Sequence, residues 1–205
     1  MSSWPMTRVG AAPAPVLSLE EARLHLRVNA ATLPLPPHSD DPLIQAYVQA
    51  ATNELDGIDG WLGRALVTQQ WRLNLDGFPA GAITLPLPPL QSVGEIRYTA
   101  PDGAELVLPP SAYRVLTWDS DPGHVEPAFG AAWPAVRRQT AAVAITYSCG
   151  FGDPAKVPEL IRNYIRLRLG QFYENRELVA VGVVVTTIPF MADSLESFRR
   201  SVRPV

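Results

Sequence analysis

The sequence has few charges, one cysteine and a single lysine, and each shortage narrows the classes of protein to which it can belong. Charged residues make up 18% of the 205 residues, whereas about 25% is usual in soluble domains. The formal net charge is only −3, which argues against a general nucleic-acid binder. Cys149 is the only cysteine, so an intrachain disulfide, and with it a secreted disulfide scaffold, is excluded.

Long apolar runs are also missing. No run reaches the ~20 residues that span a bilayer, and the longest, residues 179–185, contains Gly182. The first residues lack the basic-then-apolar pattern of a signal peptide. We therefore expect a soluble protein that has no membrane partner and is intracellular when it is made.

The residues that usually carry catalysis or bind metals are few and lie far apart. His25, His38 and His124 have no histidine, cysteine or acidic partner at metal-ligand spacing. Residues 150–152 (Gly-Phe-Gly) lack the third glycine of a dinucleotide loop and the Gly-Lys-Ser/Thr of a phosphate loop. The sequence shows no base beside Cys149 that would make it a nucleophile. We expect no enzyme, no metal and no cofactor.

Apolar residues and prolines, by contrast, are plentiful. Hydrophobic residues make up 47% of the chain, which is enough to build a core and excludes wholesale disorder. The chain holds 21 prolines, roughly twice the usual share of about 5%. Because each proline removes an amide donor and fixes φ, a continuous helical bundle or coiled coil is excluded.

The charges are unevenly distributed along the chain. Residues 1–136 carry 7 basic and 14 acidic side chains, whereas residues 137–205 carry 10 basic and 6 acidic ones. Of the 17 basic residues only Lys156 is a lysine, and arginine is the better residue for forked contacts to carboxylates and carbonyls. The asymmetry favours copies, or a copy and a partner, that meet head to tail. The arginine excess also fits the codon bias of a GC-rich genome.

The N-terminal third predicts a loose leader and two helices. Small and turn-forming residues indicate a flexible leader over residues 1–16. Ser18 and Glu21 form a capping box that begins a helix at 18–28. After an extended Pro-rich connector, an apolar stripe at helical spacing predicts a second helix over residues 42–58.

The middle of the chain, residues 66–147, has the period of short strands separated by prolines and glycines. The expected strands cover residues 71–76, 83–85, 95–99, 105–108, 113–118 and 142–147. Helical spacing returns over residues 157–175. We therefore expect an α+β fold, with N- and C-terminal helices packed together beside a small antiparallel sheet or barrel-like region and an extended C-terminal arm.

The last helix and the arm carry the candidate interaction residues. Arg162, Arg166 and Arg176 lie on the polar stripe of the helix, whereas Arg168 projects toward its apolar side and either snorkels or faces another chain. We expect these four arginines at an interface between subunits. The arm, residues 178–205, is too apolar to stay exposed and should dock on something.

The order of these elements resembles the head–tail connector (adaptor) proteins of tailed bacteriophages, which are also found in prophages and gene transfer agents. The resemblance covers about residues 17–177, and its segments are 17–28, 40–44, 63–69, 71–73, 77–79, 85–86, 88–93, 133–134, 147, 150–152, 157–158 and 172–177. It implies a core domain over 17–177 and a structural role at the head–tail interface of a particle assembled in a bacterial host.

The resemblance further implies the partners. Adaptors form a ring, dodecameric in the family, under the portal protein, and they extend the DNA channel toward a stopper or tail-completion protein. Their C-terminal segment inserts into the portal, and the residues expected to make that contact here are Leu195, Phe198, Arg199, Arg200 and Arg203. An acidic N-terminal part suits a channel that passes double-stranded DNA without sequence-specific binding, because basic linings grip phosphate.

Three other hypotheses stay open from the sequence. The chain can be another head-completion (stopper) or tail-completion ring protein, which only its partners distinguish. It can be a small enzyme that uses Cys149 with His124 or His25. It can also be a soluble domain of unrelated function, in which case the ordered segments match by coincidence.

Overall fold

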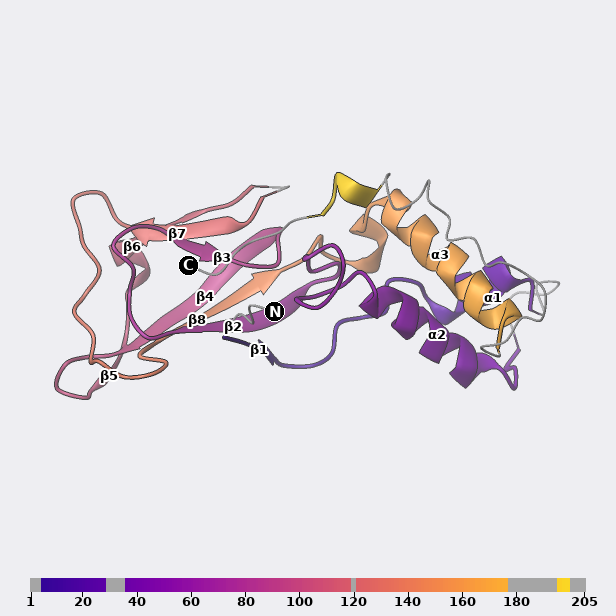
Figure 1. Ribbon diagram of the computed structural model, residues 1–205, viewed down its shortest axis with the longest axis horizontal. Helices are drawn as coiled ribbons and strands as arrows, with labels where there is room; N and C mark the ends of the chain where they lie inside the picture. The colour runs from indigo at the N-terminus through magenta and orange to yellow at the C-terminus, as the bar shows by residue number, and fades with distance from the viewer. Residues whose placement is uncertain (1–4, 29–35, 119–120, 177–194, 200–205) are drawn as a thin grey trace.

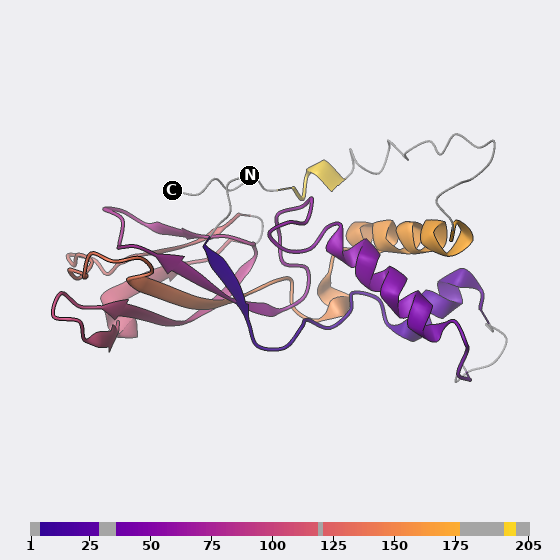
Figure 2. The ribbon, with the colours of Figure 1, turned by 60° about the horizontal axis from the view of Figure 1, so that its bottom comes forward.

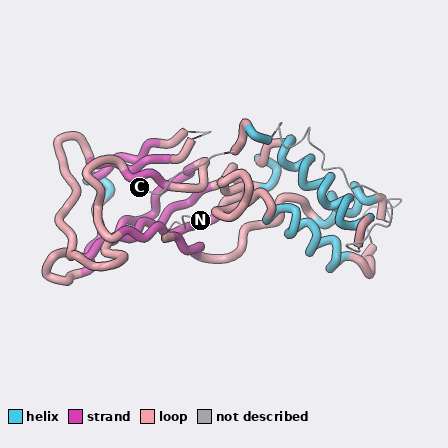
Figure 3. The backbone as a smooth tube through the Cα atoms, viewed as in Figure 1, coloured by secondary structure: helices cyan, strands magenta, loops and turns pink. Residues whose placement is uncertain are grey.

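The protein is elongated, with its helices at one end and its strands at the other. The computed structural model describes residues 5–28, 36–118, 121–176 and 195–199. Helices gather at one end of the long axis and strands at the opposite end, and the loop between α2 and β2 lies where the two parts meet (Figures 1 and 3). The α+β class expected from the sequence is confirmed.

Three α-helices build the helical end of the described chain. They are α1 (Leu19–Leu26), α2 (Asp41–Asn53) and α3 (Glu159–Glu174), and α3 packs against both α1 and α2. The predicted capping box is present, because the Ser18 hydroxyl accepts from the Glu21 amide at 3.1 Å and the Glu21 carboxylate accepts from the Ser18 amide at 2.9 Å. Helix α2 ends at Asn53, before the predicted residue 58, and the chain turns back through Gly57 at φ 84°.

Five antiparallel strands form the larger sheet. Their spatial order is β1 (Met6–Val9), β2 (Gln69–Leu75), β8 (Val143–Cys149), β4 (Leu90–Thr99) and β5 (Glu105–Val107). The register places Trp71 opposite Tyr147, and Ile145 opposite both Leu73 and Ile96. Every second residue of β8 is buried, as expected for a strand with one face on a core.

A smaller sheet faces the same core. It consists of β3 (Ile83–Leu85), β7 (Gly123–Pro127) and β6 (Tyr113–Leu116), all antiparallel. Ile83 and Val125 of this sheet pack in one apolar cluster with Leu73 and Ile145 of the larger sheet. Both sheets are open rather than closed into a barrel, which decides between the two arrangements expected for the middle region.

Two strands were not expected from the sequence. Strand β1 lies inside the predicted loose leader, where it pairs antiparallel with β2, from Met6 opposite Leu73 to Val9 opposite Gln70. Strand β7 begins with Gly123 and ends with Pro127, residue types that are depleted in strands. Gly123 is required there by packing, because a Cβ atom at this position would lie 2.2 Å from the Leu90 side chain.

Candidate docking surfaces

The C-terminal turn, residues 195–199, lies against the chain's own helical core. Leu195 is 1% exposed and belongs to the apolar cluster of the three helices, and Phe198 packs against that cluster. Figures 1 and 2 place this turn (yellow) where the helices meet the sheets. Three of the five expected portal contacts, Leu195, Phe198 and Arg199, therefore have partners within the chain, while Arg200 and Arg203 lie outside the described residues.

Trp61 and Arg64 contact this turn, and Phe151 lies against Arg64; we call these three residues the arm seat. Arg64 is 2% exposed, and its Nε donates to the Phe198 carbonyl oxygen. The Arg64 guanidinium lies 5.8 Å from the centre of the Phe151 ring. The Arg199 guanidinium lies 5.2 Å from the centre of the Trp61 ring, a cation–π arrangement. The seat therefore touches both the backbone and a side chain of the turn.

No pattern in the sequence indicates the arm seat. Arg64 and Phe198 are 134 residues apart along the chain, and no periodicity connects positions so distant. Arg64 follows Gly63 in a loop, where a charged residue is ordinarily expected at the surface. Its burial is visible only once the fold brings the turn to it.

Arg162 is the most deeply buried of the four candidate arginines, of which Arg162, Arg166 and Arg168 lie on α3 and Arg176 follows it. It is 7% exposed, and its Nη1 donates to the carbonyl oxygens of Val16 at 3.2 Å and Pro154 at 2.8 Å. It also pairs with Glu21 of α1. Although burial opposes the effect, hydrogen bonds from Ser18 together with the Arg162 charge lower the pKa of Glu21. This arginine joins α3 to α1 and to the segment before it.

The other three arginines also have partners within the chain. Arg168 pairs with Glu54 just after α2, with Nε to Oε2 at 2.7 Å, and stacks 4.7 Å from the Phe172 ring centre. Arg176 pairs with Asp40 at 2.8 Å. Hydrogen bonds from Tyr173 and Arg176 lower the pKa of Asp40. Arg166 pairs with Glu159 on its own helix.

Three of these ion pairs join the acidic N-terminal part of the chain to its basic C-terminal part. Glu21, Asp40 and Glu54 belong to the acidic N-terminal part of the chain, and their partners belong to the basic C-terminal part. The arginines therefore bind α3 to the first two helices of the same chain. Arg176 still exposes 48% of its side chain, so it keeps surface that a neighbour can contact.

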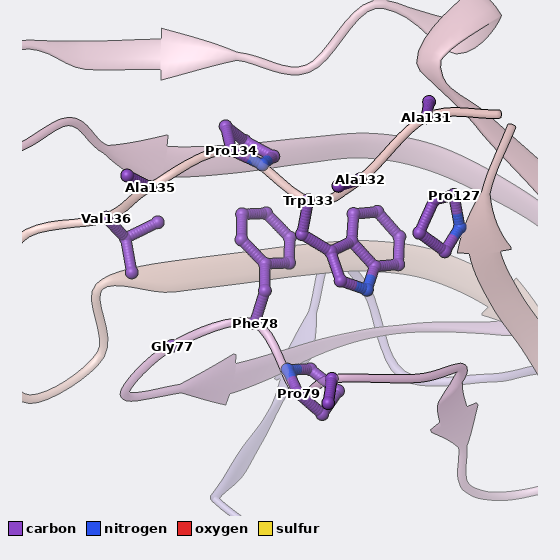
Figure 4. A pocket seen from close by; sticks show the side chains of 11 residues that line it. Gly77, Phe78, Pro79, Pro127, Ala131, Ala132, Trp133, Pro134, Ala135 and Val136 are labelled. Atoms are coloured by element: carbon purple, nitrogen blue, oxygen red, sulfur yellow. The ribbon is translucent and has the colours of Figure 1, made fainter.

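The end of the molecule far from the helices carries an apolar groove and an exposed aromatic ring. Phe78 and Trp133 stack at 4.8 Å with an angle of 7° between their rings. They line a cavity of about 450 Å³ together with Pro79 and Pro127, as Figure 4 shows. Phe129, in the loop that follows β7, is 98% exposed. A fully exposed phenylalanine beside an apolar groove is typical of a contact surface.

The fold as a whole is similar to solved neck proteins of gene transfer agent (GTA) particles. A chain from the neck of an empty GTA particle computed with C6 symmetry matches with a TM-score of 0.75 and 27% identity, covering 98% of this chain and 97% of that one. A chain from the virion of a native GTA particle matches at 0.74 and 26%, with the same coverage. No protein-family model and no curated protein matches.

A third structure, the neck of a native GTA particle computed with C12 symmetry, matches at a TM-score of 0.68 and 24% identity. At that identity it supports the fold alone. The first two likenesses cover nearly the whole chain. They support a neck-type structural protein of phages or gene transfer agents, located in the particle.

The geometry around the candidate nucleophile fits this structural role. Cys149 is fully buried on β8, with its thiol 3.8 Å from the Gln69 carbonyl oxygen. Burial raises the pKa of Cys149, which keeps the thiol protonated. His124 lies on the other sheet, where its ring meets Trp118 edge to face at 5.2 Å. The arrangement gives no support to a thiolate activated by histidine.

Metal binding and membrane insertion receive no support from the described part of the chain either. Among residues 5–28, 36–118, 121–176 and 195–199, no three His, Cys, Asp or Glu side chains come together as a metal site would require. In the same residues, no helix combines the length and the apolar character needed to cross a bilayer.

Proposed function

We propose that this chain is the head–tail connector (adaptor) subunit of a tailed phage or gene transfer agent, forming a ring under the portal protein. The observation that carries the proposal is the likeness to particle-neck chains over 98% of the sequence. It coincides with the adaptor resemblance of segments spread over residues 17–177. The proposed role is to extend the DNA channel from the portal toward the tail.

The portal contact is assigned to the C-terminal arm, residues 178–205. Leu195 and Phe198 provide apolar anchors, and Arg199, Arg200 and Arg203 provide forked donors for carboxylates or carbonyl oxygens. An arm that becomes ordered on its partner loses conformational entropy, which its apolar contacts must offset. Arginine, with tryptophan and tyrosine, is among the residue types that supply most of the binding energy at interfaces.

Neighbouring copies complete the proposed ring. The similar necks have C6 and C12 symmetry, and the adaptor family implies twelve copies. Arg166 and Arg176, whose side chains are 21% and 48% exposed, remain candidates for the subunit interface. Double-stranded DNA passes through without sequence-specific binding, and a stopper or tail-completion protein binds the ring on its tail side.

Deleting residues 190–205 tests the portal contact. Because α3 ends at Glu174, we expect the shortened chain to fold, with some loss of stability since Leu195 leaves the core. It should no longer sediment with rings of the portal protein encoded beside it. Circular dichroism provides the control for folding. A folded, shortened chain that still attaches to the portal would refute the assignment.

Another ring of the neck, such as a stopper, is the second candidate, because the likeness to neck chains does not by itself distinguish the rings. The direct partner does. An adaptor binds the isolated portal ring, whereas a stopper binds only after an adaptor is in place. Sedimentation of the full chain with the portal alone therefore separates the two.

A further inference from the structure

We propose that the arm seat (Trp61, Arg64 and Phe151) is a binding site for the C-terminal turn that competes with the portal. In the free subunit the seat holds residues 195–199 on their own chain, and attachment to the portal requires the turn to leave it. This inference rests on the proposed adaptor function, because it concerns the same arm.

The buried side of the turn is the reason why the two contacts exclude one another. Leu195 is 1% exposed within the helical cluster, and the Phe198 carbonyl oxygen accepts from Arg64. The side that faces outward presents the polar residues Glu196, Ser197 and Arg199 instead. While the turn is seated, Leu195 therefore cannot contact a portal, and the partly buried Phe198 cannot present its whole ring to one.

The outer contacts of the seat are weak enough to be exchanged. Trp61 is 37% exposed, and the Arg199 side chain above it is 48% exposed. A cation–π contact at such an exposed site stabilises by only about 0.5–1 kcal/mol. The Arg199–Glu196 pair, at 3.5 Å with both side chains about half exposed, adds little. A partner that covers the anchors more completely can therefore displace the seat.

Such a seat has two physical consequences. It covers apolar side chains that would otherwise favour aggregation of the free subunit. Because only subunits with a free arm can bind, the apparent affinity for the portal equals the intrinsic affinity multiplied by the fraction of such subunits. Several copies that engage one portal ring together offset that reduction through avidity.

Trp61→Ala in the full-length chain tests the competition. Removing the ring takes away the Arg199 contact without touching the anchors, so the arm is released more often. We expect W61A to bind portal rings about 2–5-fold more tightly than the wild type, the factor that corresponds to an exposed cation–π contact. Trp61→Phe keeps an aromatic ring for Arg199 and should restore an affinity near that of the wild type.

Trp118→Ala is the matched control. Trp118 is similarly exposed, at 45%, but lies in the β part against His124, so W118A should bind like the wild type. Phe198→Ala removes an anchor and should bind more weakly. If the wild type binds the portal and W61A binds it equally well or more weakly, the proposed competition is refuted and the adaptor function stands.

A readout without the portal keeps the two proposals separate. The amides of Phe198 and Arg199 donate within the turn at 2.9 and 3.0 Å, so their hydrogen exchange reports whether the turn is seated. Exchange over residues 195–199 should be about 2–5-fold faster in free W61A than in the wild type, and unchanged exchange would overturn the seat. If exchange accelerates but no variant binds the portal, the adaptor function fails and the seat stands.

Discussion

Arg162 shows how one side chain can join several segments of a small domain. It is 7% exposed and serves two backbone carbonyl oxygens, from Val16 and Pro154, besides the Glu21 carboxylate. A buried carbonyl or carboxylate that loses its donor has no water to replace it. The arginine that the sequence analysis placed at a subunit interface has an intrachain structural role.

Arg162→Ala should therefore destabilise the fold strongly. We expect the free energy of unfolding to fall by about 3 kcal/mol, since one partner of a buried pair is removed. Arg166→Ala on the same helix should lower it by less than about 1 kcal/mol, because Arg166 pairs with an exposed Glu159. Urea denaturation of both variants measures the difference. Equal losses would contradict the structural role of Arg162.

Asp56 gives the stability a pH dependence of defined sign. Burial raises its pKa, although hydrogen bonds from Leu66 and Gln69 and the charge of Arg8 oppose the rise. The folded state therefore holds the proton more tightly than the unfolded state. The associated stability is present below the unfolded pKa of about 3.9 and is lost as pH rises through the folded pKa.

Asp56→Asn removes that dependence. Between about pH 4 and pH 7, the wild type should become less stable relative to D56N as pH rises, because only the wild type gains a partly buried charge. Comparing the two chains cancels the opposite contributions of Glu21 and Asp40, whose pKa values are lowered. Urea midpoints at several pH values test this. A difference that stays constant, or changes in the other direction, would contradict it.

At the scale of elements, local sequence signals predicted what local physics determines. The capping box of α1, the apolar stripes of α2 and α3, and the alternation of β2 and β8 are each encoded within a few residues. Strand β1 carries no such signal, because its four residues are ordered by pairing with β2. Likewise, the seat of the C-terminal turn depends on contacts between distant residues, which periodicity does not reveal.

Gly150 directly follows β8, in a conformation that only glycine adopts easily. Its φ is 118°, and an added Cβ would lie 2.4 Å from the Val67 carbonyl oxygen. Gly150→Ala should destabilise the chain by about 3 kcal/mol, combining backbone strain with the clash. At Gly81 a Cβ would meet nothing within 4 Å, so Gly81→Ala should change stability by less than about 1 kcal/mol. Thermal unfolding of both variants decides the point, and an unaffected G150A would refute it.

The whole molecule carries two separate candidate contact surfaces. The C-terminal turn occupies the arm seat where the helices meet the sheets (Figures 1 and 2), whereas the end far from the helices carries the groove of Phe78 and Trp133 (Figure 4). The exposed Phe129 lies in the loop between Pro127 and Ala131, two residues that line this groove. A long subunit with two well-separated surfaces suits a component that contacts more than one neighbour in a neck. Sequence periodicity did not single out Phe129, because exposure in a loop leaves no pattern.

Phe129→Ser separates stability from assembly. Since Phe129 is 98% exposed, the free energy of unfolding should change by less than about 0.5 kcal/mol. If the Phe129 side chain is buried against a neighbour in the neck, incorporation of the variant into particle necks should fall several-fold, because a buried phenylalanine stabilises an interface by about 1.5–3 kcal/mol. Quantifying the chain in purified particles measures this. Normal incorporation of the variant would show that Phe129 is not part of a contact surface.

An adaptor must assemble on its portal protein, and electron microscopy of the chain mixed with that portal tests this directly. If the chain is an adaptor, its copies should form a closed ring stacked coaxially on the portal, with the C-terminal arm of each copy entering the portal. A folded chain and an intact portal that form no complex would contradict it.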